Sequence, residues 1–324
     1  MNRRELIALL GSATFWPLAT WAQQKAMSVV GTLSGFSPPA NLGDLLRGPI
    51  NQGMGEMGFV EGRNLMWEYR RAEGHYERLA ALAADLVSRK VDVIVTNGTP
   101  SALAAKNATS TIPIVFAGVG DPVGVGLVAS LARPGGNLTG FSVFGAELVP
   151  KRIELLCELL PQAAAIALLV NPNKKMSDHL VRAAEEATHV KGVRLDVLKA
   201  SSEGAIEPAF AQLHADAFLV DGDLFFVARR EQLAALAARL GVPAIYPLHE
   251  FVAAGGLISY GPDVGAQYRQ AGIYAGRILK GERPADLPVQ QPTTFKLVIN
   301  LKAAKDLGLT IPPSILARAD EVIE

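Results

Sequence analysis

Short apolar segments alternate with amphipathic segments along most of the chain after Met27. The apolar segments are rich in β-branched residues, which is typical of buried strands. In the segments between them, apolar residues recur every three or four positions, which predicts helices. Apolar strands separated by helices predict parallel sheets covered on both faces. The expected strands are 28–33, 65–69, 91–96, 114–117, 165–170, 194–198, 217–220 and 244–246, and the expected helices include 44–57, 76–89, 151–160, 177–190 and 229–240.

The predicted strands form two sets that follow one plan: a strand, a long helix, a second strand, another helix and two further strands. The break lies at Pro134-Gly135-Gly136-Asn137. Three later segments have no third sheet to join, so we expect them to pack on the first two units. They are a helix at 263–280, a proline-rich stretch at 284–294 and a helix at 301–307. A chain of 324 residues suits two domains of about 150 residues each. The sequence therefore predicts an α/β fold of two doubly wound parallel-sheet lobes.

The first 22 residues differ from the rest of the chain. Arg3 and Arg4 precede an apolar stretch at 6–19, and Thr20-Trp21-Ala22 offers small residues at the two positions that determine cleavage. This pattern is typical of a signal peptide, and the stretch is too short to span a bilayer. The paired arginines resemble a twin-arginine signal, although the general export route stays open. We therefore expect a periplasmic mature protein with no stable membrane insertion.

The charge of the chain is balanced, with 31 basic and 31 acidic residues. A chain of this kind has no electrostatic footprint for nucleic acid or an anionic membrane. Cys157 is the only cysteine, so no internal disulfide can form, and a lipoprotein cysteine does not follow the signal. Cys157 lies in a helical pattern and is predicted to be a small buried hydrophobe.

Polar residues follow the predicted strands at equivalent positions. Because ligands of doubly wound sheets bind beyond the carboxyl ends of the strands, these residues are candidates for one cleft. Ser34, Thr99 and Asp121 belong to the first set, and Asn171 and Asp223 to the second. Capping of helices is the simpler interpretation of any one of them, but their number favours a shared cleft.

Two of these positions carry a proline directly after the polar residue. Thr99-Pro100 and Asp121-Pro122 read as a helix cap followed by the first helical residue. The free N–H groups of a helix start favour a carboxylate or phosphate oxygen, whereas Asp121 and Asp223 suit an amine or hydroxyls. Together they suit an amino acid or a similar zwitterion. We also expect the cleft carboxylates to be solvated when the lobes are open, so that they matter to binding more than to folding.

Tyr246 closes the last strand of the second set. It either stacks on a ligand or is a partly buried tyrosine at a hinge, and the sequence leaves both interpretations open.

Signals for catalysis are poor. The chain has no G-x-x-x-x-G-K-[ST] or G-x-S-x-G motif, and its five histidines are not paired at metal-ligand spacing. The stretch 118–124 has the wrong spacing for a dinucleotide loop. We therefore expect no enzyme activity, no metal and no cofactor.

Several motifs together resemble the ABC-transporter substrate-binding family related to tryptophan-binding receptors, which have the type I periplasmic binding protein fold. They are Gly31-Thr32-Leu33-Ser34, Gly58-Phe59-Val60-Glu61-Gly62-Arg63-Asn64, Asn97-Gly98-Thr99-Pro100, Gly120-Asp121-Pro122-Val123, Arg133-Pro134-Gly135-Gly136-Asn137-Leu138-Thr139-Gly140, Ile245-Tyr246-Pro247 and Val298-Ile299-Asn300-Leu301. The resemblance covers essentially the whole mature chain.

The resemblance implies that a ligand lies between two lobes joined by a three-segment hinge, with crossings near Gly140, Tyr260 and Pro288. The lobes would then comprise 23–140 plus 261–288 and 141–260 plus 289–324. Ser34, Thr99 and Asp121 would line one wall of the cleft, and Asn171, Asp223 and Tyr246 the other.

These observations favour a non-catalytic, monomeric solute-binding protein of an ABC importer that captures a small molecule by hinge closure and delivers it to a permease. The alternatives are a periplasmic ligand sensor that feeds a signalling kinase and, with less support, an exported hydrolase.

Overall fold

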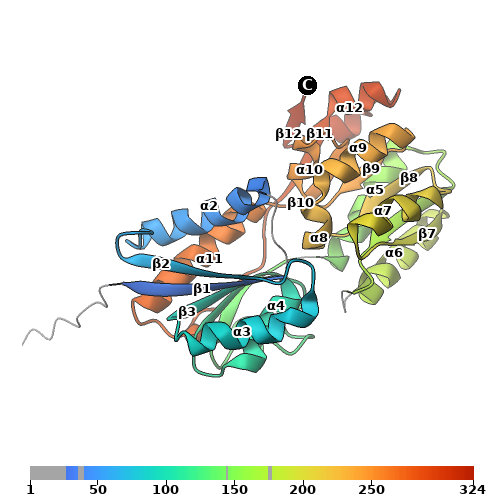
Figure 1. The fold of residues 1–324 in the computed structure, drawn as a ribbon. Coiled ribbons are helices and arrows are strands. Elements are labelled where there is room, and N and C mark those ends of the chain that lie inside the picture. Colours follow the sequence, from blue (N-terminus) through green and yellow to red (C-terminus); the bar gives the residue numbers. More distant parts are fainter. Residues whose placement is uncertain (1–26, 36–39, 144, 174–176) are drawn as a thin grey trace, which may run out of the picture.

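Two α/β lobes, each built around one sheet, make up the computed structural model (Figure 1). The structure describes residues 27–35, 40–143, 145–173 and 177–324, so the predicted signal peptide at 1–22 lies outside the described residues. Within the described ranges, no helix is long and apolar enough to cross a membrane.

The first lobe contains a parallel five-stranded sheet of order β2-β1-β3-β4-β5. Alternate strand residues point to opposite faces, so that Val93 and Val95 pack in one apolar cluster and Ile94 in another. Helices α2 and α11 cover the first of these faces, and α3 and α4 cover the second. The elements are β1 (Ser28–Ser34), α2 (Ala40–Glu56), β2 (Leu65–Arg71), the 3-10 helix η1 (Tyr76–Arg78), α3 (Leu79–Ser88), β3 (Val93–Asn97), α4 (Gly98–Ala108), β4 (Ile114–Val119), β5 (Leu138–Ser142) and α11 (Val264–Leu279).

The second lobe contains a seven-stranded sheet of order β12-β11-β10-β9-β8-β6-β7. Helices α5, α6, α12 and α13 pack on one face and α7 to α10 on the other. The elements are η2 (Ala146–Leu148), α5 (Val149–Leu159), β6 (Ala165–Val170), α6 (Ser177–Lys191), β7 (Arg194–Lys199), α7 (Glu203–Ala211), β8 (Ala217–Val220), α8 (Leu224–Val227), α9 (Arg230–Leu240), β9 (Ala244–Tyr246), α10 (His249–Ala253), β10 (Ile258–Pro262), β11 (Phe295–Asn300), α12 (Leu301–Asp306), α13 (Pro313–Leu316) and β12 (Glu321–Ile323). The 3-10 helix η3 (Pro284–Asp286), which precedes β11 in sequence, contacts β5 of the first lobe.

The second sheet differs from the prediction at one pair of strands. β10 and β11 pair antiparallel, whereas every other pair in the two sheets is parallel among the described residues. A parallel pair requires a crossover that packs on the same sheet. The helix between these strands, α11, packs on α2 of the first lobe instead, so the chain re-enters the second sheet from the opposite end.

The chain passes between the lobes three times: from β5 to α5, from β10 to α11, and from α11 to β11. At the first passage Gly140 lies directly against the backbone of Phe116 in β4, and a Cβ atom at this position would overlap the Phe116 carbonyl. A glycine is therefore required for β5 to pair closely with β4 just before the chain leaves the lobe.

Helix α11 is held to the first lobe by backbone-to-backbone packing against α2. Gly53 of α2 lies against the carbonyl of Arg269, and Gly272 of α11 lies against the carbonyl of Ile50, with no room for a Cβ at either glycine. The Arg269 guanidinium also forms a bidentate ion pair with Glu56, with N–O distances of 2.6 and 2.7 Å. The glycines set the distance between the helices. The half-exposed ion pair contributes little to the stability of the protein by comparison.

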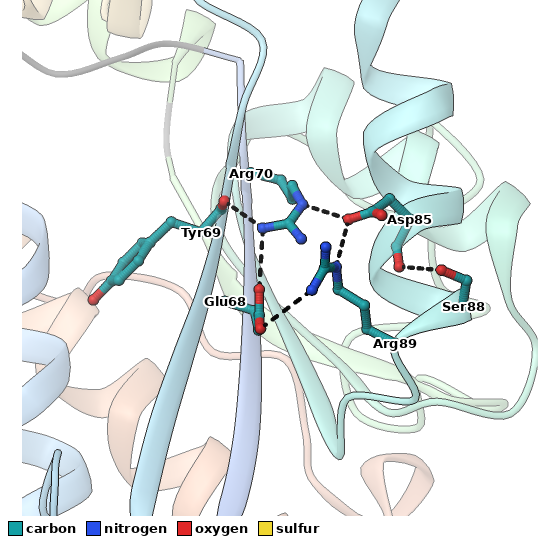
Figure 2. A network of polar contacts seen from close by, with 6 residues as sticks. All are labelled: Glu68, Tyr69, Arg70, Asp85, Ser88 and Arg89. Carbon is teal, nitrogen blue, oxygen red and sulfur yellow. Dashed lines mark hydrogen bonds and ion pairs between the residues drawn. The ribbon is translucent and has the colours of Figure 1, made fainter.

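A charged network holds the edge strand β2 to α3 (Figure 2). The Arg70 Nε donates to Asp85 Oδ2 at 2.5 Å, and the Arg89 Nε donates to the same oxygen at 3.0 Å. Glu68 lies within ion-pair distance of both arginines, at 3.2 and 3.6 Å. Both arginines lower the pKa of Asp85, chiefly through these hydrogen bonds. The outer edge of the first sheet is therefore lined by paired charges.

We expect Gly272→Ala to destabilise the protein by about 1–3 kcal/mol, because the added methyl forces α2 and α11 apart. Gly55→Ala is the matched control: Gly55 lies in α2 with nothing near its missing Cβ, so alanine there should be neutral or stabilising by up to about 1 kcal/mol. Urea denaturation of both variants measures the difference. Equal free energies of unfolding would show that the close contact does not set the helix spacing.

Candidate ligand-binding cleft

A cavity lies between the lobes, at the carboxyl ends of strands from both sheets. In the first lobe its wall is formed by residues that follow β1, β3 and β4, and by the start of α11. In the second lobe it is formed by residues that follow β8 and β9 and by the end of β10, with contributions from α5 and α6. This is where open parallel sheets bind ligands.

Three of the six predicted site residues line this cavity: Thr99 and Asp121 from the first lobe and Asp223 from the second. Two others lie directly behind the wall. Ser34 is buried at the end of β1, and its neighbour Gly35 lines the cavity. Asn171 is buried after β6, and its Nδ2 donates to Asp223 Oδ1 at 3.2 Å. Asn171 therefore orients a wall residue in this arrangement.

Tyr246 lies away from the cavity. Its side chain is fully buried, and its ring stacks on Phe251 with centroids 4.8 Å apart. It belongs to the apolar cluster beneath α7 to α10. Neither the predicted stacking on a ligand nor a partly buried hinge position fits this location.

The predicted caps also differ from the structure. Helix α4 begins at Gly98 with Asn97 at the N-cap, so Thr99 and Pro100 lie inside its first turn. Gly98 has φ +77°, a conformation that glycine adopts easily, which lets the chain turn sharply from β3 into α4 beside the cavity. No helix follows Asp121: a turn does, in which Asp121 Oδ1 accepts the N–H of Gly124 at 2.9 Å.

The second-lobe wall carries a buried acidic pair and a buried arginine. Asp221 and Asp223 follow β8, with only 1% and 7% of their surfaces exposed. Arg152 of α5 is buried as well, and its Nε donates to the Tyr260 carbonyl at 2.8 Å. Burial lowers the pKa of Arg152 to about 10, against the attraction of Asp221, so the guanidinium keeps its charge at neutral pH. Among the described residues, no group of three or more His, Cys, Asp or Glu is placed to hold a metal ion.

Tyr76 reaches from the first lobe toward this acidic pair. It begins the short helix η1, and its ring lies over Gly35, where a Cβ atom would come within 2.6 Å of Tyr76 Cε1. Burial raises the pKa of the Tyr76 phenol well above its usual range, and the carboxylates of Asp223 and Asp221 raise it further. The phenol thus stays protonated and remains a hydrogen-bond donor at the boundary between the lobes.

The first-lobe wall contains polar atoms without partners. Ser101 Oγ, Gln267 Oε1 and Tyr268 Oη have no hydrogen-bond partner among the described residues, although all three residues are more than nine-tenths buried. All three line the cavity. Since an unsatisfied buried polar group costs about 1–3 kcal/mol, their common location is typical of a ligand site.

Arg152 and Gln267 were missed from the sequence, although each left a signal there. Arg152 interrupts the apolar series of α5, in which Val149, Ile153 and Leu156 recur at helical spacing. Gln267 does the same in α11 between Val264 and Ala271. A polar residue on the buried stripe of a helix requires a polar partner, which is how such positions can be found.

The two sheets, the three connections and the cleft between them define a two-lobed solute-binding protein, as the sequence predicted. Residues 40–323 match the family model described as ABC transporter substrate binding protein. The chain belongs to this family.

A tyrosine-binding protein of Clostridioides difficile (strain R20291) is 29% identical over 256 residues, which cover 78% of this chain and 74% of that protein. The ABC domain from Streptococcus pneumoniae in complex with L-Trp has a TM-score of 0.81 and 29% identity, covering 91% of this chain and 100% of that one. The ligand-free, open structure of a Clostridium difficile substrate binding protein with adhesive properties has a TM-score of 0.65 and 27% identity, covering 92% and 99%.

We expect Asp223→Ala to lower the free energy of unfolding without ligand by about 1 kcal/mol. This corrects the expectation that a cleft carboxylate contributes little to folding, because Asp223 is buried and caps α8, where its Oδ1 accepts the Phe225 N–H at 2.9 Å. Asp223→Asn keeps an oxygen that can cap the helix and should remain near wild type. Urea denaturation compares the two variants, and an alanine variant as stable as the asparagine variant would contradict the capping role.

Proposed function

We propose that this family member is the periplasmic receptor of an ABC importer and that it captures an amino acid or a similar small zwitterion for delivery to a permease. The observation that carries the proposal is the cavity lined from both lobes, because only a ligand held from both sides favours the closed state. The protein acts as a monomer without turnover.

The chemistry of the cavity supports a small amphiphilic ligand. Apolar side chains such as Val143, Leu180 and Leu248 line it beside the buried acidic pair and the first turn of α4. Two relatives add support, one named as tyrosine-binding and the other bound to L-Trp. An apolar body with a charged end fits such a lining.

Hinge closure is part of the proposal. The L-Trp complex and the ligand-free, open relative cover nearly the same share of this chain at similar identity, yet their TM-scores are 0.81 and 0.65. A different angle between the lobes lowers a whole-chain superposition score in this way. The moving bodies would be 23–140 plus 261–288 and 141–260 plus 289–324, and the three passages between the sheets are consistent with this division.

We expect L-tryptophan or L-tyrosine to raise the melting temperature of the mature protein, since a ligand that binds only the native state adds about 2.7 kcal/mol of stability at 100 times its Kd. The same ligand should reduce the radius of gyration in small-angle scattering. Sugars and nucleosides serve as comparison compounds in the same thermal-shift screen. Stabilisation by a sugar but by no amino acid would contradict the proposed ligand class, and an unchanged radius at saturation would contradict closure.

We expect the mature chain to begin near Gln23 and to be recovered from the periplasm. Replacing Arg3 and Arg4 with lysine should block export if the twin-arginine route carries the protein. Immunoblots of cell fractions measure precursor and mature forms. Normal processing of the double-lysine variant would reject this route and favour the general one, whereas a precursor retained in the wild type would reject export.

A further inference from the structure

The second passage between the lobes, from β10 to α11, is very short. Gly261 of β10 is pressed against the second lobe, where a Cβ atom would overlap the Pro247 carbonyl oxygen. Asp263 already belongs to α11, because it is the N-cap and its Oδ1 accepts the Ala266 N–H at 3.0 Å. Pro262 lies between these two anchored residues, and its ring fixes its own φ angle. The chain therefore turns from one lobe to the other at Pro262.

The third passage, from α11 to β11, ends beside the second. Its first part is held to the first lobe, since the Gln290 N–H donates to the Gly140 carbonyl at 3.0 Å and the Gln290 carbonyl accepts the Ser142 N–H at 2.9 Å. The chain then joins the second sheet at Phe295, the first residue of β11, which pairs with Pro262 of β10. The two passages that border α11 thus come together at the Pro262–Phe295 pair.

An ion pair joins the lobes at this point. Lys296 Nζ of β11 donates to Asp263 Oδ2 at the start of α11, with an N–O distance of 2.9 Å. Burial raises the pKa of Asp263, but the hydrogen bonds from Ala266 and Lys296 outweigh burial and lower this pKa below its usual value. The hydrogen bond to Asp263 raises the pKa of Lys296. Both groups are therefore charged at neutral pH.

The length of this ion pair depends on the angle between the lobes. The carboxylate of Asp263 turns with α11 and the first lobe, because the helix backbone holds one of its oxygens. Lys296 is fixed in the second sheet, where it pairs with Gly261. A rotation at Pro262 therefore moves one partner relative to the other. Further titratable groups act on the pair from the second lobe: His249, Asp320 and Glu321.

We propose that Asp263 and Lys296 form a hinge ion pair that favours the closed arrangement of the lobes and thereby contributes to ligand affinity. The inference rests on the hinge closure of the proposed function. The chain superposes better on the L-Trp complex than on the ligand-free, open relative, with TM-scores of 0.81 and 0.65, and the ion pair is formed at this lobe angle. A contact made at one angle shifts the equilibrium toward that angle.

Spin labels on exposed helix positions of the two lobes measure the angle between them. Ala84→Cys in α3 and Glu186→Cys in α6 supply the attachment sites, and Cys157→Ser removes the native thiol. Pulsed electron paramagnetic resonance on the ligand-free mature protein then gives the distribution of distances between the lobes. This measurement needs no ligand, so its outcome is separate from the test of the proposed ligand class.

Lys296→Met and Asp263→Asn each remove one charge of the hinge ion pair. Methionine keeps an apolar stem, and asparagine keeps an oxygen that can cap α11. Each variant should lower the ratio of closed to open populations by about 2–5-fold, as expected for a partly exposed ion pair. The double variant should shift this ratio no further than either single variant, because the second change has no partner left to lose. High salt should shift the wild type in the same direction and leave the double variant unchanged.

Lys302→Met is the matched control. Lys302 pairs with Asp306 at 2.7 Å within α12, so this ion pair lies inside one lobe and its loss should leave the distances unchanged. Calorimetry with L-tryptophan and L-tyrosine supplies a second readout, in which Kd should rise about 2–5-fold in the hinge variants and stay constant in the control.

The inference is overturned if neither the distances nor Kd change in the hinge variants, or if Lys302→Met changes them equally. If neither amino acid binds the wild type, that result counts against the proposed ligand class, and the distance distributions alone decide on the hinge ion pair.

Discussion

The contact between α2 and α11 fixes the geometry on which the rest of the molecule depends. Helix α11 is bordered in sequence by two strands of the second sheet, yet Gly53 and Gly272 let it lie against α2 of the first lobe. Two of the three passages between the lobes therefore begin or end at this helix. It also brings Gln267 and Tyr268 to the cavity wall, so the contact between the two helices positions part of the candidate site.

The cavity is a place where the fold leaves polar groups unsatisfied. Unpartnered hydroxyl and amide oxygens on its first-lobe wall reduce the stability of the ligand-free protein. Folded domains are stable by only about 5–15 kcal/mol, so several such groups in one place lower the free energy of unfolding by a substantial fraction. In the proposed function these groups would gain partners from the ligand, and lobe closure would then depend on the ligand's chemistry. Asp223 on the opposite wall, by contrast, caps α8 and accepts a hydrogen bond from Asn171.

Much of the fold could be predicted because strong local patterns agreed with it. The strands 165–170, 217–220 and 244–246 were predicted with the observed bounds, since each is an apolar run ended by turn residues. β10 was missed because Gly261 and Pro262 are unusual in strands, and β11 because its partner lies across a helix that belongs to the other lobe. Strand ends located Thr99, Asp121 and Asp223 because sheet topology alone brings them together. The position of Tyr246 depended on packing against Phe251, which no local pattern encodes.

The charged edge of the first sheet has a consequence for the protein in a crowded compartment. An edge strand presents unpaired backbone groups that can recruit a strand from another molecule. On β2 the side chains beside that backbone are Glu68, Arg70 and Arg71, and the network with Asp85 and Arg89 holds two of them in place. In the second sheet, the edge strand β7 likewise carries charged side chains, those of Arg194, Asp196 and Lys199. A second chain would have to strip water from these charges before it could pair, so both edges are poor templates for intermolecular β-structure even at high protein concentration.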